Sequence, residues 1–211
     1  MENKRYSTTS KVFQTLKEDR FPEKDEQLVW QRFISGDDQS LIHIYRKYVH
    51  VLFRYGQQFS RRHEFVEDCI QELFCELIAK RKRLSKVQTI KAYLFTSLKR
   101  KIFRDLKKQE KLQFDEDGFY FSFAELPISI SNDLTERDYS IIFQKINLLP
   151  ASQREIIFLY FYEGCNYSEI AEIRNVKIET ARTLTYRALE NLEKQLGPYL
   201  SSFYFLISLF S

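Results

Sequence analysis

The sequence predicts an all-α protein made of two small helical domains joined by a flexible linker, and three observations support this fold class. Only five of the 211 residues are glycine and four are proline, which is too few for the many turns of a β-sandwich or a doubly wound sheet. Apolar residues recur at spacings of three and four along most of the chain, as in amphipathic helices. Between residues 112 and 133 this periodicity stops, which predicts a linker.

The first domain is expected at residues 25–111, after a polar arm at 1–24 that lacks periodicity. Its first two helices flank a Ser-Gly-Asp-Asp break at 35–38, a composition typical of turns. A third helix is predicted from about His63 to Lys82 and a fourth from about Thr89 to Lys108, because each carries an apolar stripe. We therefore expect a four-helix unit.

The linker at 112–133 is acidic and unusually rich in aromatic residues for a free spacer, with Phe114, Phe119, Tyr120, Phe121 and Phe123. Two interpretations remain open. The aromatic side chains dock on a partner, or they pack on the protein's own domains. The linker has about 22 residues and could span about 70 Å when fully extended.

The second domain is expected at 134–196 and begins with a helix at 134–147. A helix follows at Gln153–Tyr162, where Pro150 marks the start and Gly164 marks the stop. The remainder of this domain has the pattern of a helix-turn-helix.

In that pattern Asn166 caps a short helix at Tyr167–Arg174, and Asn175 tolerates the left-handed conformation that a tight turn requires. The next helix is predicted from about Glu179 to Gln195. Its exposed start would face the DNA major groove, so the candidate DNA-binding residues here are Lys177, Glu179, Thr180, Arg182, Thr183 and Arg187. An ordinary helical hairpin inside a core is the alternative.

Charge is unevenly distributed along the chain. The formal net charge is only +4, yet residues 80–111 carry 13 basic and two acidic side chains, a local charge of +11. Such a concentration is typical of a surface that binds a polyanion. On the predicted fourth helix the basic side chains that turn away from the apolar stripe are Arg100, Arg104, Lys107, Lys108 and Lys111.

Other function classes find little support. The three histidines have no Cys, Asp or Glu partner at ligand spacing, and no glycine-rich phosphate loop or nucleophile motif occurs. We therefore expect no enzymatic activity, cofactor, metal or small-molecule substrate. The three cysteines show no CxxC spacing, no apolar signal segment is present, and the apolar run Tyr199–Phe210 is too short for a membrane-spanning helix. A cytoplasmic location is expected.

Several motifs occur along the chain in a fixed order. They are Glu67-Asp68-Cys69-Ile70-Gln71-Glu72-Leu73-Phe74, Ala92-Tyr93-Leu94-Phe95-Thr96, Leu149-Pro150-x3-Arg154-Glu155-Ile156, Tyr167-Ser168-Glu169-Ile170-Ala171, Glu179-Thr180-Ala181-Arg182 and Tyr186-Arg187-Ala188-Leu189. The first resembles region 2.2 of extracytoplasmic-function (ECF) sigma factors in the sigma-70 family. The second, with the basic run after it, resembles regions 2.3 and 2.4, and the others resemble region 4.

The resemblance implies a subunit that binds core RNA polymerase and directs promoter recognition and transcription initiation. Region 2.2 would bind the β′ clamp helices through Asp68, Gln71 and Glu72, and region 4 would contact the β flap. Regions 2.3 and 2.4 would bind the promoter element near the start site through the basic row of the fourth helix, with Tyr93 or Phe95 stacking on a base. Region 4 would bind the distal element.

Some features depart from the family. Lys177 stands where a Ser or Thr cap is usual, Asn175 replaces the usual Gly, and Leu184-Thr185 breaks a common Ser-Arg-Leu run, so the bases that are read stay open. The apolar tail at 197–211 has no standard counterpart. It packs on the protein's own domains, contacts an inhibitory anti-sigma factor, or lies on a membrane surface. An anti-sigma partner is expected in any case.

A stand-alone helix-turn-helix regulator that binds an operator is the main alternative function. Such a protein would use the C-terminal unit in the same way, but it would leave the polar face of Asp68, Gln71 and Glu72 without a role. Dependence on RNA polymerase distinguishes the two.

Overall fold

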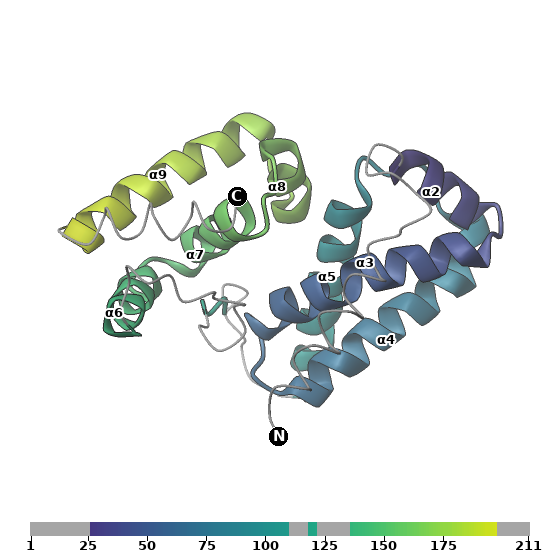
Figure 1. Ribbon diagram of the computed structural model, residues 1–211, viewed down its shortest axis with the longest axis horizontal. Coiled ribbons are helices and arrows are strands. Elements are labelled where there is room, and N and C mark those ends of the chain that lie inside the picture. Colours follow the sequence, from purple (N-terminus) through teal and green to yellow (C-terminus); the bar gives the residue numbers. More distant parts are fainter. Residues whose placement is uncertain (1–25, 110–117, 122–135, 198–211) are drawn as a thin grey trace, which may run out of the picture.

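The computed structural model describes residues 26–109, 118–121 and 136–197, and within these ranges every regular element is helical. The N-terminal unit contains α2 (Glu26–Ile34), α3 (Asp38–Gln57), α4 (His63–Lys80), the 3-10 turn η2 (Arg81–Arg83) and α5 (Ile90–Gln109). The C-terminal unit contains α6 (Glu136–Asn147), α7 (Ala151–Ile157), the π-helical segment η3 (Phe158–Tyr162), α8 (Tyr167–Arg174) and α9 (Ile178–Leu196) (Figure 1). The predicted arm at 1–24 and tail at 197–211 lie outside the described residues, apart from Gly197.

Helices α3, α4 and α5 cross at close range in the N-terminal unit. The first of them begins where the Asp37 side chain accepts hydrogen bonds from the backbone N–H groups of Gln39 and Ser40, which caps the helix. A Cβ atom on Gly56 would lie only 2.6 Å from Cγ1 of Val66. The absence of a side chain at Gly56 therefore lets α3 approach α4.

Helix α2 fixes the loop between η2 and α5. The indole N–H of Trp30 donates to the backbone oxygen of Ser85 at 2.9 Å, and the amide of Gln27 donates to the backbone oxygens of Val87 and Gln88. Trp30 itself is fully buried. The loop that precedes the basic helix is thus held in one conformation by side chains from the start of the domain.

The helix-turn-helix forms as predicted. Asn166 and Glu169 make a reciprocal capping box at the start of α8, and Asn175 ends it with φ 53° and ψ 49°, in the left-handed region that asparagine tolerates. Small residues, Ala181 and Ala188, face the core from α9. Thr185, noted above as a departure, is buried and donates its hydroxyl to the backbone oxygen of Ala181.

The helix predicted at Gln153–Tyr162 differs in detail from the structure. It begins at Ala151 and its last turn is π-helical, so the N–H of Glu163 bonds to the oxygen of Phe158. Apolar periodicity does not separate a final α turn from a π turn, because both place the same side chains on the core side.

Two linker aromatic residues pack on the protein's own domains. Phe119 and Phe121 are buried, and Phe119 lies between Phe59 of the N-terminal unit and Phe158 of the C-terminal unit, with ring centroids at 5.3 and 5.5 Å. The N–H of Tyr120 also donates to the oxygen of Gln58. Residues 118–121 are therefore a fixed bridge, whereas Phe114 and Phe123 lie outside the described residues.

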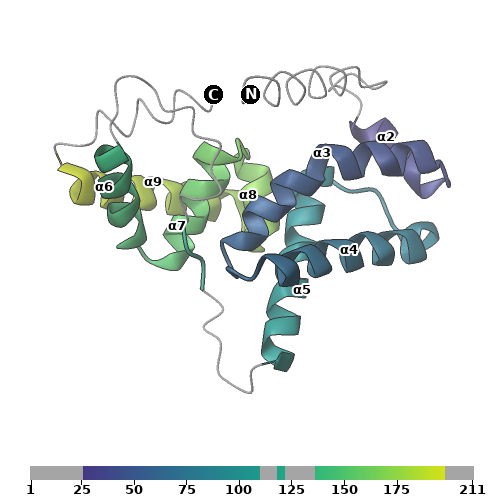
Figure 2. The ribbon, with the colours of Figure 1, turned by 60° about the horizontal axis from the view of Figure 1, so that its bottom comes forward.

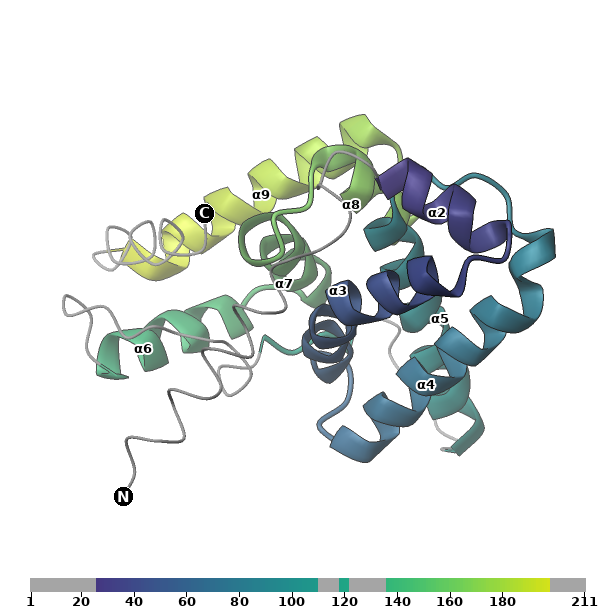
Figure 3. The same ribbon diagram turned by 45° about the vertical axis from the view of Figure 1, so that its right-hand side comes forward.

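The two units contact each other directly. Helix α8 packs along α5, and Figures 2 and 3 show α8 beside the N-terminal unit from two directions. No helix among the described residues is long and apolar enough to cross a bilayer.

Candidate nucleic-acid and polymerase interface

The predicted basic row is present on α5. Arg100, Arg104, Lys107 and Lys108 are exposed, while Leu94, Leu98 and Ile102 of the same helix are buried. A solvated row of cations on one helical face fits contact with phosphates. The fifth predicted cation, Lys111, lies outside the described residues.

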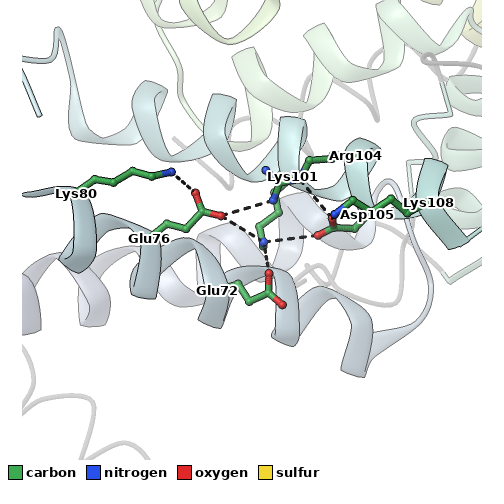
Figure 4. A network of polar contacts seen from close by, with 7 residues as sticks. All are labelled: Glu72, Glu76, Lys80, Lys101, Arg104, Asp105 and Lys108. Atoms are coloured by element: carbon green, nitrogen blue, oxygen red, sulfur yellow. Dashed lines mark hydrogen bonds and ion pairs between the residues drawn. The ribbon is translucent and has the colours of Figure 1, made fainter. Parts of the chain in front are cut away.

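Lys101 connects the basic row to α4, and sequence reasoning did not single it out. Its side chain is only 4% exposed, and its ammonium contacts Glu72 directly, Glu76 at 3.7 Å and Asp105 at 3.6 Å (Figure 4). The i,i+4 spacing of Lys101 and Asp105 was the available signal. The lysine places one cation among three carboxylates.

Two of the predicted DNA-binding cations touch the same carboxylates. Arg104 lies 3.5 Å from Glu76 and 3.4 Å from Asp105, and Lys108 lies 3.4 Å from Asp105 (Figure 4). Burial alone would raise the pKa of Asp105, but the charge of Lys101 and the hydrogen bonds from Arg104 and Lys108 outweigh it and hold that pKa below its usual value. Burial likewise opposes the charge of Lys101, yet the contacts with Glu72 and Asp105 raise its pKa.

The predicted polymerase-binding residues share one face of α4. Asp68, Gln71 and Glu72 are exposed and follow one another at helical spacing. Glu72 differs from the other two because it also pairs with Lys101. This face is therefore connected to the basic row by one charge network.

The two candidate stacking residues of α5 have different surroundings. Phe95 is buried, with its ring 4.5 Å from that of Tyr55, so it belongs to the core. Tyr93 is half-buried, its ring lies 5.3 Å from that of Trp30, and it lines two clefts of the surface. Only Tyr93 keeps the position expected of a stacking residue.

The start of α9 presents the predicted recognition residues to solvent. Lys177, Glu179, Thr180, Arg182, Thr183 and Arg187 are all exposed. The Thr183 hydroxyl donates to the backbone oxygen of Glu179, and the Arg182 guanidinium lies over the ring of Tyr167, 5.5 Å from its centroid. The ring orients Arg182 by a cation–π contact.

The two candidate DNA-binding faces border one cleft of about 630 Å³. Tyr93 and Arg100 line it from α5, and Lys177 and Glu179 line it from the start of α9. The Gln88 amide donates to the Ser168 hydroxyl across the same space.

A buried carboxylate, Glu155, joins the two units. The Lys99 ammonium donates to both of its oxygens at 2.8 Å, and the Tyr55 hydroxyl donates at 2.6 Å. Arg174, which belongs to the same unit as Glu155, also donates a hydrogen bond to the Glu155 carboxylate. Burial raises the pKa of Tyr55 well above its usual value, and the charge of Glu155 adds to this effect.

A second acid, Glu163, makes a similar connection. It accepts from Arg54 at 3.3 Å and lies 3.8 Å from the Lys91 ammonium. Burial raises the pKa of Glu163, and the charges of Arg54 and Lys91 offset only part of that rise. Neither inter-unit acid was identified from the sequence.

Two family models match the chain in the expected order. Residues 44–112 match sigma-70 region 2, and residues 140–192 match sigma-70 region 4. Together they cover more than half of the sequence. The chain belongs to the sigma-70 family.

Individual sigma factors are similar over much of its length. The sigma factor SigV of Bacillus subtilis is 26% identical over 145 residues, which are 68% of this chain and 83% of SigV. The ECF sigma-E factor of Escherichia coli K12 is 30% identical over 112 residues, which are 53% of this chain and 57% of that protein. This chain is thus an ECF-type sigma factor, a non-enzymatic subunit that directs RNA polymerase in promoter recognition and transcription initiation.

Two solved structures share the fold. CnrH, in complex with the cytosolic domain of CnrY, superposes with a TM-score of 0.57 at 17% identity and covers 81% of this chain and 96% of CnrH. RpoE of Bartonella quintana, in complex with the anti-sigma factor NepR, gives a TM-score of 0.53 at 27% identity over 75% of this chain and 95% of RpoE. The predicted sigma factor is confirmed, and the alternative of a stand-alone operator-binding regulator is set aside.

Proposed function

We propose that this sigma factor contacts promoters at two points, with region 2 on the element near the transcription start and region 4 on the distal element. The observation that carries the proposal is the separation of exposed DNA-binding candidates onto two helices of different units. The exposed cations of α5 would hold phosphates, with Tyr93 stacking on a base. The start of α9 would enter the major groove.

The polymerase would be bound through the α4 face of Asp68, Gln71 and Glu72, which suits an arginine-rich surface such as the β′ clamp helices. Region 4 would contact the β flap. The corresponding domains are proposed at 25–111 and 134–196, with 112–133 as the linker, and the site of action is the cytoplasm.

An anti-sigma factor is proposed as a regulator of this chain. The support is the likeness to RpoE, whose solved structure contains the anti-sigma factor NepR. Because this chain and RpoE share a fold at 27% identity, an anti-sigma factor is the natural candidate for a partner of this chain as well.

Run-off transcription with core RNA polymerase on sheared genomic DNA tests the function. Discrete start sites that require the protein are expected, and their absence would contradict the proposal. Arg182→Ala should weaken the dependence on the distal element by roughly 10-fold, while a promoter preference equal to that of the wild type would show that the recognition helix is misassigned.

The polymerase-binding face is tested by Asp68→Lys. This change avoids Glu72, whose reversal would also disturb the Lys101 network. Glu67→Lys is the matched control, since it makes the same charge change at an exposed neighbouring position of α4. Only Asp68→Lys should weaken binding to core polymerase. An equal loss of affinity in both variants would show that the loss depends on the net charge of the protein and not on the polymerase-binding face.

A further inference from the structure

Arg182 at the start of α9 lies over an aromatic ring from the preceding helix. Its guanidinium is 5.5 Å from the ring centroid of Tyr167, which is the first residue of α8. Lys177 and Arg187 are the other candidate DNA-binding cations of this face, and neither contacts a ring among the residues that the structure describes. Within that part of the chain, Arg182 is therefore the cation of this face whose position is restricted by an aromatic side chain.

The ring of Tyr167 is itself held in place by Tyr160. The two rings stack with their centroids 5.2 Å apart and an angle of 21° between their planes. Tyr160 belongs to the π-helical segment η3, and Phe161 of the same segment packs edge-on against it at 4.8 Å. Short π-helical segments are rare and are frequently found at functional sites. A row of aromatic rings thus connects η3 with Arg182.

The contact with the ring leaves the hydrogen-bonding groups of Arg182 available. A ring face attracts the charge of a guanidinium, whereas a carboxylate accepts hydrogen bonds from its N–H groups. Arg104 of α5 is paired in the second way with Glu76 and Asp105, but Arg182 has no hydrogen bond or ion pair within the described ranges. Its N–H groups form a fork that matches two acceptors on one base edge, such as O6 and N7 of guanine.

A restricted position has a consequence for recognition. An exposed arginine has many rotamers, and it loses that freedom when it binds. A side chain that is already held loses less on binding, and this favours the base pair that it reaches from its held position. Resting on the proposed contact between α9 and the distal element, we propose that Tyr167 is a positioning residue for promoter recognition and sets the base preference of Arg182 through its ring.

The test measures base preference with the full chain bound to core RNA polymerase. The base pair that Arg182 reads is identified as the one whose replacement weakens promoter binding by the wild type but not by Arg182→Ala. Tyr167→Leu should reduce the preference for this base pair by about 2- to 5-fold, the size of an exposed cation–π contact. Tyr167→Phe keeps the ring and should keep the preference. Destabilisation of the fold would weaken binding to both promoters and leave the preference unchanged.

A double-mutant cycle separates positioning from an independent effect. In the Arg182→Ala background, Tyr167→Leu should cause no further loss of preference, because the arginine that the ring positions has been removed. Arg187→Ala is the matched control, since it removes the same charge at an exposed position of the same helix. In the Arg187→Ala background, Tyr167→Leu should still cause its full loss of about 2- to 5-fold.

Three outcomes would overturn the proposal and leave the proposed function standing. They are an unchanged preference in Tyr167→Leu, an equal loss in Tyr167→Phe and Tyr167→Leu, and an equal effect of Tyr167→Leu with and without Arg182. If Arg182→Ala itself alters no base preference, the proposed role of the start of α9 is wrong and this inference fails with it.

Discussion

Replacement of Lys101 by methionine should affect both the stability of the N-terminal unit and its affinity for DNA. The change keeps most of the side-chain volume but removes the cation that lies among Glu72, Glu76 and Asp105. Lys101 is almost completely buried, so it does not contact phosphate itself. Any loss of DNA binding therefore acts through its neighbours.

The magnitude follows from the exposure of the carboxylates. Removing one partner of a fully buried ion pair costs about 3–5 kcal/mol, but Glu72 is 66% exposed and its carboxylate regains water. We expect the free energy of unfolding to fall by about 1–2 kcal/mol, near the value of a hydrogen bond to a charged group. The uncompensated carboxylates of Glu76 and Asp105 would then draw Arg104 and Lys108 away from DNA.

Urea denaturation and the salt dependence of promoter binding measure the two effects. Each phosphate contact contributes about 0.9 to the slope of log affinity against log salt, so withdrawal of Arg104 and Lys108 should reduce the slope by about 1–2. Lys107→Met, at an exposed position on the same helix, should lower the slope without loss of stability. An unaltered slope in Lys101→Met would refute the reasoning, even if the protein were less stable.

Three other substitutions probe the packing and charge of the two units. Glu155→Gln should destabilise the protein by about 2–4 kcal/mol in urea denaturation, because the partly buried cations Lys99 and Arg174 lose their counter-charge; a loss below about 1 kcal/mol would contradict this. Glu163 has a raised pKa in the folded protein, so its contribution to stability is greatest below its ordinary pKa of 4.5 and is lost as the pH rises through the folded value. The difference in unfolding free energy between the wild type and Glu163→Gln should accordingly fall as the pH rises, and a flat or rising difference would exclude the effect. Gly56→Ala should destabilise by about 1–3 kcal/mol despite alanine's higher helix propensity, since the new Cβ would lie 2.6 Å from Val66, and Val66→Ala should restore part of the loss.

Local features of this chain were predictable because their chemistry lies within a few residues. The cap at Asn166 and the left-handed turn at Asn175 follow from the side chains themselves. Apolar periodicity likewise predicted the positions of the helices, and it predicted that the basic row of α5 is exposed to solvent. The start of α9 was predicted to be exposed for the same reason, and it is.

Long-range pairing was not predictable in the same way. Glu155 appeared in a family motif, but its partners Lys99 and Tyr55 are 56 and 100 residues away in the sequence. Helical periodicity reports which side of a helix is buried, not what covers it. For the same reason the sequence left open whether Phe119 packs on a partner or on the chain itself, and it did not single out Lys101 as a buried cation.

The contacts between the two units differ in the free energy that each would lose if the units were separated. Ions such as Lys99 and Glu155 recover hydration when they separate, so a buried ion pair often contributes little net stability against water. Burial of an aromatic side chain such as Phe119 is different, because about 1.5–3 kcal/mol is lost when it returns to water. Burial of Phe119 at the bridge of residues 118–121 therefore contributes to holding the units together, while the charged groups specify how the units dock. Phe119 belongs to the segment 112–133 that is proposed as the linker, so any separation of the two units that lengthened this segment would also remove the contacts of Phe119 with both units.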